Sequence, residues 1–592
     1  MDLLLKNWQK TYGYVIMLEK CRMIPYLQKE GRKLAGALIM KLKNISVAAL
    51  ASFLLVIFLP VFGYVIFIGN NMNYNSLHKI YAIYGNKVLL ALVLAGVLAF
   101  LLLIFSLRKI PYNRYTVIGF VVFALIGSGA FYFVNVEISK CIAFYGGWDC
   151  GMVANSARWV YEGEGLGHGV YYNIYTNNVP ITWLLHKLYV LAIENPVYPY
   201  NPEFVWIQFQ CLMHAAAVFF SAMAVLLVCK RISFALLVFV INSVLLTLSP
   251  WKIIPYTDAS TIAAPVFVIF LYAVFSRMKS AWKYLLWLFL AFAGLMGGVM
   301  KATCYVPLIA VVIIEFIGVF GRQRKAARVV KELLLYIVLL LGAYALASAC
   351  KHGMYQEIGF EYDRDLEIGW TAYLYDGLDE ETTGACSGGG FGIAYEFQGQ
   401  SKATRVEYEW KCIKERLQEK GFGGLLDFWL RKLVMTYNDG TFSWFQEGAF
   451  HAWEYEEITD SSRKEALRSF FWDDGENYQQ FITVSHGMWL FVLVGVLCEA
   501  FVALINAILR LKGRKPGTEQ DSSELSVCAA VILHFVGLFF FMMLFEGRAR
   551  YLYNSVAVFA TMAVLGYCKF VDLLVLYLPE IRKNCKVRFR KG

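Results

Sequence analysis

The feature that most constrains this chain is a series of apolar runs, most of them near the roughly 20 residues that a helix needs to cross a bilayer. The composition agrees, because 59% of the 592 residues are hydrophobic and 17% are charged, whereas a soluble domain carries about a quarter charged residues. We therefore expect an all-α polytopic membrane protein with about twelve transmembrane helices. The predicted spans are 45–69, 86–107, 115–136, 204–228, 232–249, 260–276, 282–300, 305–320, 329–350, 484–509, 525–546 and 552–572.

The basic residues predict which ends of these spans face the cytoplasm, because cytoplasmic loops are enriched in Lys and Arg. One set of connections and termini holds 33 Lys and Arg, and the short loops on the other side hold nine. This asymmetry predicts that both termini are cytoplasmic. A further apolar stretch, 180–194, is short and contains His186 and Lys187, so we interpret it as a helix lying at the membrane interface. If this stretch were counted as a span, every later loop would be assigned to the opposite side of the membrane.

The same pattern divides the chain into parts with different roles. The segment 351–483 holds 25 Asp and Glu against 13 Lys and Arg, so it is an acidic extracytoplasmic domain, which we expect to be α-rich. The net charge of +11 then reflects anchoring to an anionic inner leaflet, not nucleic-acid binding. The predicted parts are a basic cytoplasmic N-terminus (1–43), two extra transmembrane helices (44–114), a transmembrane core (115–350) with an outer loop (137–203), the acidic domain (351–483), three last transmembrane helices (484–572) and a basic cytoplasmic tail (573–592).

Unusual polar residues gather in four short segments that this topology places on the same outer face. Lys and Arg at an outer interface are tolerated where they have an anionic partner, and phosphate is one that both side chains bind well. A carboxylate in a partly desolvated cleft can accept a proton from a hydroxyl group. The candidate residues are Asp149, with Asn177 and Asn178 downstream; Tyr256 and Asp258; Lys301; and Arg548 with Arg550.

Structural roles compete with these functional ones. Asp149 would cap a helix over 150–163, and Asp258 would cap the span 260–276. Lys301 would extend its ammonium from a helix end towards water. Arg548 and Arg550 would point apart on a helix but to one side in an extended turn, with Glu546 neutralising one of them.

Three other patterns favour structural interpretations. His168 lies in the first outer loop, where a lone histidine is more often solvated than bound to a metal. Pairing of Cys141 with Cys150, or of Cys386 with Cys412, stays open as an outer disulfide. The glycine-rich run 387–392 follows no strand and opens no clear helix, so we interpret it as a flexible loop and not as a phosphate cradle.

At this point the sequence resembles a known family, the integral-membrane glycosyltransferases of the GT-C fold. Within them it is most similar to bacterial relatives of protein O-mannosyltransferases and the lipid A aminoarabinose transferase, which are glycosyltransferase family 39-like. The similar motifs are "NNVP", "PYTD", "KAT", "EGRARYLY" and "YNDGTFSWFQEGAF", spread over residues 110–572. Two features depart from the family pattern. Cys150 stands where many O-mannosyltransferases have the second residue of an Asp-Glu pair, and two extra spans precede the core.

The resemblance implies a GT-C-like bundle that acts on the outer face of a bacterial cytoplasmic membrane. Its donor would be a polyprenyl-phosphate sugar, and its acceptor an envelope glycan, a teichoic acid, a lipid or a protein. Asp149 would deprotonate the acceptor hydroxyl, and the sugar would transfer with inversion. The motifs specify no cofactor; a divalent metal stays open, with Asp258 helping to hold it. Residues that would bind the donor and its phosphate are Lys301, Arg548, Arg550, Asp258, Tyr256, Asn177 and Asn178.

Other classes of function remain open at this level. A transporter or flippase for lipid-linked glycans would carry functional charges inside its spans. A polysaccharide polymerase or ligase would use a polyprenyl-diphosphate donor and an outer arginine-rich loop, without needing Asp149. A non-catalytic scaffold of envelope assembly would keep a degenerate site.

Overall fold

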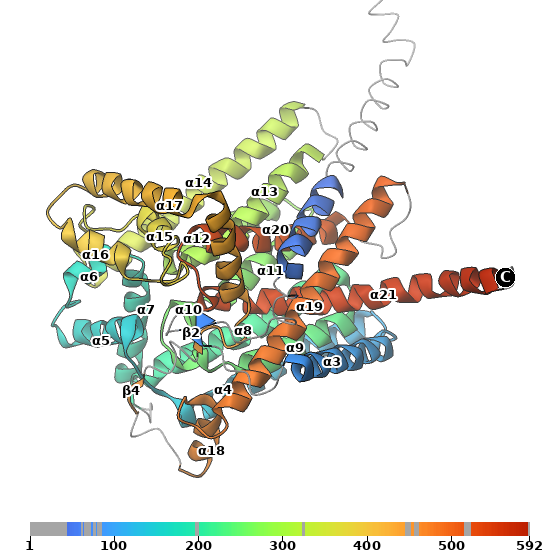
Figure 1. The fold of residues 1–592 in the computed structure, drawn as a ribbon, viewed down its shortest axis with the longest axis horizontal. Helices are drawn as coiled ribbons and strands as arrows, with labels where there is room; N and C mark the ends of the chain where they lie inside the picture. The colour runs from blue at the N-terminus through green and yellow to red at the C-terminus, as the bar shows by residue number, and fades with distance from the viewer. Residues whose placement is uncertain are drawn as a thin grey trace, which may run out of the picture.

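The chain folds into a bundle of long apolar helices with a smaller helical region at one end (Figure 1). The computed structural model describes residues 44–60, 63, 73–74, 78–79, 86–195, 201–321, 326–444, 451–454, 461–513 and 522–589. Within these ranges nine helical stretches are long and apolar enough to cross a membrane, and three apolar helices are shorter. The protein is an all-α polytopic membrane protein, as the apolar runs predict.

Each of the twelve predicted spans coincides with a helix in the described part of the chain. The 61–69 portion of the first predicted span falls almost entirely outside the described residues. The helices are Asn44–Pro60, α3 (Asn86–Leu107), α4 (Arg114–Ile142), α8 (Phe204–Cys229), α9 (Ile232–Leu248), α11 (Ala263–Arg277), α12 (Trp282–Met300), α13 (Tyr305–Gly321), α14 (Ala326–Glu357), α19 (Tyr478–Leu511), α20 (Ser522–Leu544) and α21 (Val556–Phe589).

Shorter elements connect these helices. The first outer loop forms β3 (Phe144–Gly146), α5 (Trp148–Glu162), α6 (Gly169–Ile174) and α7 (Asn178–Glu194). Helix α7 matches the stretch that we interpret as interfacial. The part of the chain between α14 and α19, which we call the late region, forms further elements. These are α15 (Trp370–Asp376), α16 (Gly389–Glu396), α17 (Lys402–Tyr437), β4 (His451–Glu454) and α18 (Ser461–Phe471). The remaining short pieces are β1 (Asn73–Tyr74), β2 (His78–Lys79), η1 (Pro250–Ile253), α10 (Thr257–Ser260), η2 (Ala302–Cys304) and η4 (Ala549–Ser555).

Local sequence explains several helix ends. Asn113 caps α4 through a reciprocal capping box with Thr116. Helix α5 ends at Gly163, whose φ of 84° suits the left-handed conformation that closes many helices. At the C-terminal end of α9, the buried Lys252 ammonium donates to the carbonyls of Thr247 and Ser249, 2.8 and 3.0 Å away. Lys252 is thus a structural cap, which separates it from Lys301, Arg548 and Arg550.

Small residues bring α19 and α21 together at the centre of the bundle. A Cβ added to Gly495 would lie 2.6 Å from the Ala563 carbonyl oxygen, and one added to Gly566 would lie 2.1 Å from the Gly495 carbonyl oxygen. Close backbone approach through small residues is the usual way in which helices pack inside a membrane, where burial of apolar surface gives little driving force.

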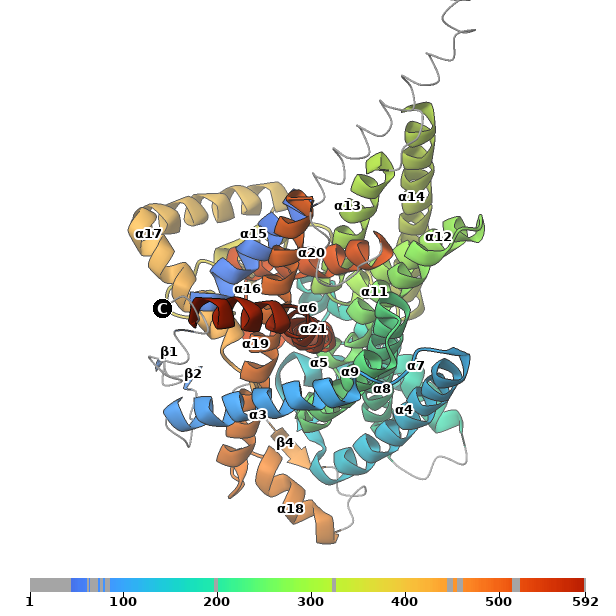
Figure 2. The ribbon, with the colours of Figure 1, turned by 90° about the vertical axis from the view of Figure 1, so that its right-hand side faces the viewer.

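The segments predicted to face outside share one end of the molecule. Helices α5, α6, α7, α15 and α16 lie together at the left of Figure 1, and the end of α21 extends to the right. Strand β3 pairs antiparallel with β4, so the first outer loop and the late region are joined directly. Figure 2 shows α17 as two arms, which meet at Gly421, where φ is 57°.

Several local predictions are wrong. Asp149 lies within the first turn of α5, which has Gly147 at its N-cap, and Asp258 lies inside α10, which has Tyr256 there. Neither carboxylate caps its own helix. The glycine-rich run opens α16 instead of forming a flexible loop. The two disulfide pairings that the sequence leaves open are not formed, since Cys141, Cys150, Cys386 and Cys412 are free thiols.

Candidate functional site

A cavity of about 390 Å³ opens between the predicted outer loop, the adjoining ends of the spans and the late region. Its lining comes from segments about 400 residues apart in sequence. Seven of the eight residues that the sequence singles out line it, and the eighth, Asp258, is buried beside it. The seven are Asp149, Asn177, Asn178, Tyr256, Lys301, Arg548 and Arg550.

On one wall, tyrosine and asparagine side chains hold the Asp149 carboxylate. The Tyr171 hydroxyl donates to Oδ1 of Asp149 at 2.8 Å and accepts from the Asn178 amide at 2.6 Å. The Tyr256 hydroxyl donates to Oδ1 of Asn178 at 3.0 Å and lies 3.4 Å from Oδ2 of Asp149. The Asn177 amide donates to the same Asn178 oxygen at 3.1 Å. This network fixes the orientation of the carboxylate and keeps part of it exposed to the cavity.

Burial changes the titration of the two tyrosines. The pKa of Tyr171 is raised, first by burial and then by the negative charge of Asp149. The pKa of Tyr256 is raised by the same two causes in the same order. Both phenols therefore stay protonated at physiological pH and act as hydrogen-bond donors.

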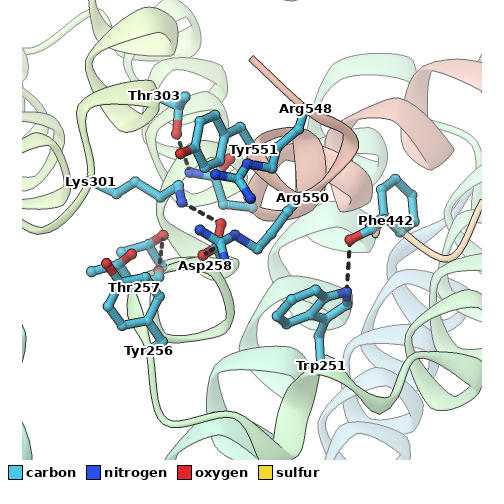
Figure 3. A network of polar contacts seen from close by, with 12 residues as sticks. Trp251, Tyr256, Thr257, Asp258, Lys301, Thr303, Phe442, Arg548, Arg550 and Tyr551 are labelled. Atoms are coloured by element: carbon cyan, nitrogen blue, oxygen red, sulfur yellow. Dashed lines mark hydrogen bonds and ion pairs between the residues drawn. The ribbon is translucent and has the colours of Figure 1, made fainter. Parts of the chain in front are cut away.

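At the same cavity, Asp258 sits between two cations (Figure 3). The Lys301 ammonium forms an ion pair with Oδ1 of Asp258, and Nε of Arg550 lies 3.6 Å from Oδ2. The Asp258 side chain is 1% exposed. Burial lowers the pKa of the Lys301 ammonium, and the Asp258 carboxylate opposes that shift. Asp258 is thus the counter-ion that allows two cations to sit at the cavity.

A second acidic residue holds Arg548 in place. Nη2 of Arg548 lies 3.0 Å from Oε1 of Glu546, and the Tyr551 hydroxyl donates to the same oxygen. Arg548 is extended, with φ −156°, and Arg550 lies in the 3-10 helix that follows it. Only Arg548 is extended, so the pair does not form an extended turn, yet both side chains line the cavity. Glu546 pairs with Arg548, as expected for one of them.

Aromatic rings lie over these cations. The guanidinium carbon of Arg550 is 4.5 Å from the centre of the Trp148 ring, and the Lys301 ammonium is 4.9 Å from that of Tyr551. Such contacts favour a cation by roughly 0.5–2 kcal/mol. They hold the positive groups at the cavity.

Hydrogen bonds to the late region hold the turn that carries Arg548 and Arg550. The backbone N–H of Glu546 donates to the Tyr373 carbonyl at 2.8 Å, and that of Gly547 to the Gly384 carbonyl at 2.9 Å. The buried Lys432 ammonium donates to the carbonyls of Gly377 and Phe545 at 2.7 and 2.6 Å. Burial lowers the pKa of Lys432 to about 7, and Glu546 opposes that shift. The position of the arginines therefore depends on the late region as well as on the bundle.

The described residues do not fit a metal site. No group of three His, Cys, Asp or Glu side chains among them is close enough to hold a metal ion. The Asp258 carboxylate faces Lys301 and Arg550 instead of open space, so the role suggested for it as a metal ligand has no support. The His168 ring, the other candidate metal ligand, lies beside the Trp159 ring, with the ring centres 5.8 Å apart.

Sequence reasoning missed two residues of this site. Tyr171, the closest partner of Asp149, was visible only as one of three tyrosines in the run 171–175. Lys432 lies in a helix with many charged residues, so the sequence did not distinguish it from its neighbours.

The motif "YNDGTFSWFQEGAF" is described only over residues 437–444. Trp444 is buried and packs on Trp251, with ring centres 5.5 Å apart. The remainder, 445–450, lies outside the described residues.

A family model described as conserved hypothetical integral membrane protein matches residues 42–513. The chain belongs to this family. The match includes Asp149, Asp258 and Lys301 and ends before Arg548 and Arg550. No curated protein and no solved structure matches the chain.

Proposed function

We propose that this protein is a GT-C-like glycosyltransferase of the bacterial cytoplasmic membrane. It moves a sugar from a polyprenyl-phosphate donor to an envelope acceptor on the outer face. The observation that carries the proposal is that the lining of one cavity contains both kinds of group. It includes an oriented carboxylate, Asp149, and three cations, Lys301, Arg548 and Arg550.

The carboxylate and the cations match the two charge movements of the reaction. Asp149 takes the proton of the acceptor hydroxyl as that oxygen forms a bond to the anomeric carbon. The bond from the anomeric carbon to the phosphate oxygen breaks, and its electron pair stays with the phosphate. The three cations stabilise the negative charge that develops there. Attack from the face opposite the leaving phosphate inverts the anomeric centre.

The competing functions fit the described residues less well. A flippase needs charged groups along an open path, but the buried Glu499 is paired with Lys569 at 2.6 Å. The cavity beside Glu499 has a volume of only about 40 Å³. A polymerase or ligase has no need for Asp149, which here is held by two tyrosines at the cavity wall.

The proposal is tested with purified protein in lipid nanodiscs. Undecaprenyl-phosphate-linked monosaccharides would be offered one at a time, with teichoic acid, capsular glycan, membrane lipid and envelope protein as acceptors. We expect one donor to release undecaprenyl phosphate only when an acceptor is present. Consumption of no donor across the panel would contradict the proposal.

A second prediction concerns the residue that sequence reasoning missed. Tyr171→Phe should lower the transfer rate by about tenfold or more, because a hydrogen bond to a charged group contributes roughly 1.5–3 kcal/mol. The neighbouring Tyr172→Phe is the matched control, since the Tyr172 hydroxyl forms a hydrogen bond with Thr182 at 2.9 Å, whereas the Tyr171 hydroxyl donates to Asp149. Initial rates at saturating donor should separate the two variants. Equal rates for both would show that Tyr171 has no special role.

A further inference from the structure

The late region carries a group of exposed aromatic side chains, which we call the rim; one of them, Trp370, lines the cavity. Between residues 358 and 416, all of which are described, the strongly exposed large apolar side chains are aromatic without exception. They are Tyr362, Trp370, Tyr395, Tyr408 and Trp410. Exposed apolar groups that gather in one place usually mark a surface for a partner or for lipid.

A second exposed patch nearby has a different chemistry. Around and beyond the bend of α17, the exposed large apolar side chains are mainly aliphatic: Leu417, Phe422, Leu426 and Leu430. An aliphatic stripe suits lipid chains. Tyr and Trp combine a flat apolar ring with a polar atom, so the rim suits a partner that has both apolar faces and hydroxyl groups.

The aromatic rings form a row that leads from Asp149 to solvent. The Tyr171 ring, whose hydroxyl binds Asp149, is 5.4 Å from the Tyr175 ring. Tyr175 lines the cavity and lies 5.8 Å from Phe391, and Phe391 lies 6.4 Å from Tyr395. The last three rings are nearly parallel, with angles of 6° and 19° between neighbours. Tyr395, at the outer end, is 59% exposed.

The row is held rigidly by the start of α16. Gly388 adopts φ 75°, and the Gly390 N–H donates to Oδ1 of Asp376 at 3.0 Å. The Ser387 hydroxyl donates to the same oxygen at 3.1 Å. A Cβ at Gly390 would lie 2.9 Å from Oδ2 of Asp376. The glycines therefore let α16 sit directly on α15, which fixes Phe391 and Tyr395 relative to the cavity.

We propose that the acceptor is a carbohydrate chain that lies along Tyr395, Phe391 and Tyr175 with its end at Asp149. This inference rests on the proposed function and selects one acceptor among those that the sequence leaves open. A pyranose ring has flat C–H faces and hydroxyl groups around its edge, so successive sugars of a β-linked chain stack on successive aromatic rings. A lipid acceptor would instead fit an aliphatic surface, and a peptide would need partners for its backbone groups.

Binding is measured without donor, on the full-length protein in nanodiscs. The probes are chitohexaose and cellohexaose, with N-acetylglucosamine and glucose as their monomers, and the readouts are saturation-transfer NMR and tryptophan fluorescence. We expect at least one hexasaccharide to bind more than tenfold more tightly than its monomer. Tyr395→Ala and Phe391→Ala should each weaken that binding by about tenfold.

Phe422→Ala is the control, because Phe422 is 81% exposed in the same region but lies outside the row. It should bind the hexasaccharide as the wild type does. Binding of neither hexasaccharide, or equal loss in Phe422→Ala, would overturn the proposal. So would transfer of labelled sugar to a lipid or a protein in place of a glycan.

Different results would contradict the proposed enzyme and the proposed glycan surface. Asp149→Asn should bind the hexasaccharide normally and transfer no sugar. If that variant transfers sugar at the wild-type rate, the assigned base is wrong and the glycan surface stands. If small acceptors are glycosylated but no oligosaccharide binds, the enzyme stands and the glycan surface is wrong.

Discussion

Asp149→Asn is expected to lower the rate of sugar transfer by about 10²- to 10⁴-fold, the range that a general base contributes. An amide cannot take the proton of the acceptor hydroxyl. The fold should survive, because asparagine has nearly the same shape and its amide oxygen still accepts the hydrogen bond from Tyr171. Initial rates at saturating donor and acceptor, together with the thermal inactivation temperature, measure the two effects.

Glu367→Gln is the matched control for this prediction. Its carboxylate accepts from the Tyr362 hydroxyl at 2.9 Å and from Thr176 at 3.0 Å, so it too is held by a tyrosine near the rim. Glu367 does not line the cavity, and its variant should transfer sugar at the wild-type rate. Wild-type activity in Asp149→Asn, or an equal loss in both variants, would remove Asp149 from the mechanism.

The helices of this protein could be predicted because their signals are local. An apolar run of sufficient length and the Lys and Arg beside it specify a membrane helix and its orientation. The grouping of the candidate residues followed from the same orientation, since it placed four distant motifs on one face. Their convergence on a single cavity is consistent with that grouping.

The partners of each site residue could not be predicted in the same way. Lys301 and Asp258 are 43 positions apart, and the sequence treats each as a separate helix-end charge. Their pairing depends on how α10 and η2 pack against η4. Tyr171 reaches Asp149 because α6 folds back on α5, a turn for which the sequence offers only a few glycines.

The contacts of the late region were even less predictable from the sequence. A Cβ at Gly377 would lie 2.5 Å from the Phe545 carbonyl carbon, and one at Gly384 would lie 2.6 Å from the Gly377 carbonyl oxygen. These glycines allow the backbone of the late region to pack directly on the end of α20. In the sequence they are ordinary loop glycines, because nothing local indicates which distant backbone they contact.

Asp258→Asn is expected to destabilise the folded protein by about 3–5 kcal/mol, because loss of one partner leaves buried charges without a counter-ion. Both Lys301 and Arg550 depend on this carboxylate, which is 1% exposed. Glu380→Gln is the control: Glu380 also sits between two cations, Lys420 and Arg431, but it is 56% exposed. Its loss should cost no more than about 1 kcal/mol.

The pH dependence of Asp258→Asn distinguishes the loss of a charge partner from a general packing defect. Burial lowers the pKa of Lys301 and Asp258 opposes that shift, so the pKa of Lys301 should fall further in the variant. Lys301 then loses its proton at a lower pH, and the alkaline limb of kcat/KM for the donor should move to lower pH. Between the folded and unfolded pKa values the unfolded chain binds the extra proton, so the unfolding free energy of the variant should rise with pH there.

A double variant completes this test. In the Asp258→Asn background, Lys301→Met removes one of the two cations that the lost carboxylate had neutralised, so it should restore part of the lost stability. In the wild-type background the same change leaves Asp258 paired with Arg550 and removes a phosphate-binding cation, so it should raise KM for the donor. Equal stability changes from Lys301→Met in the two backgrounds would mean that Lys301 and Asp258 act independently, and the cavity would then lack the charge-balanced wall on which phosphate binding depends.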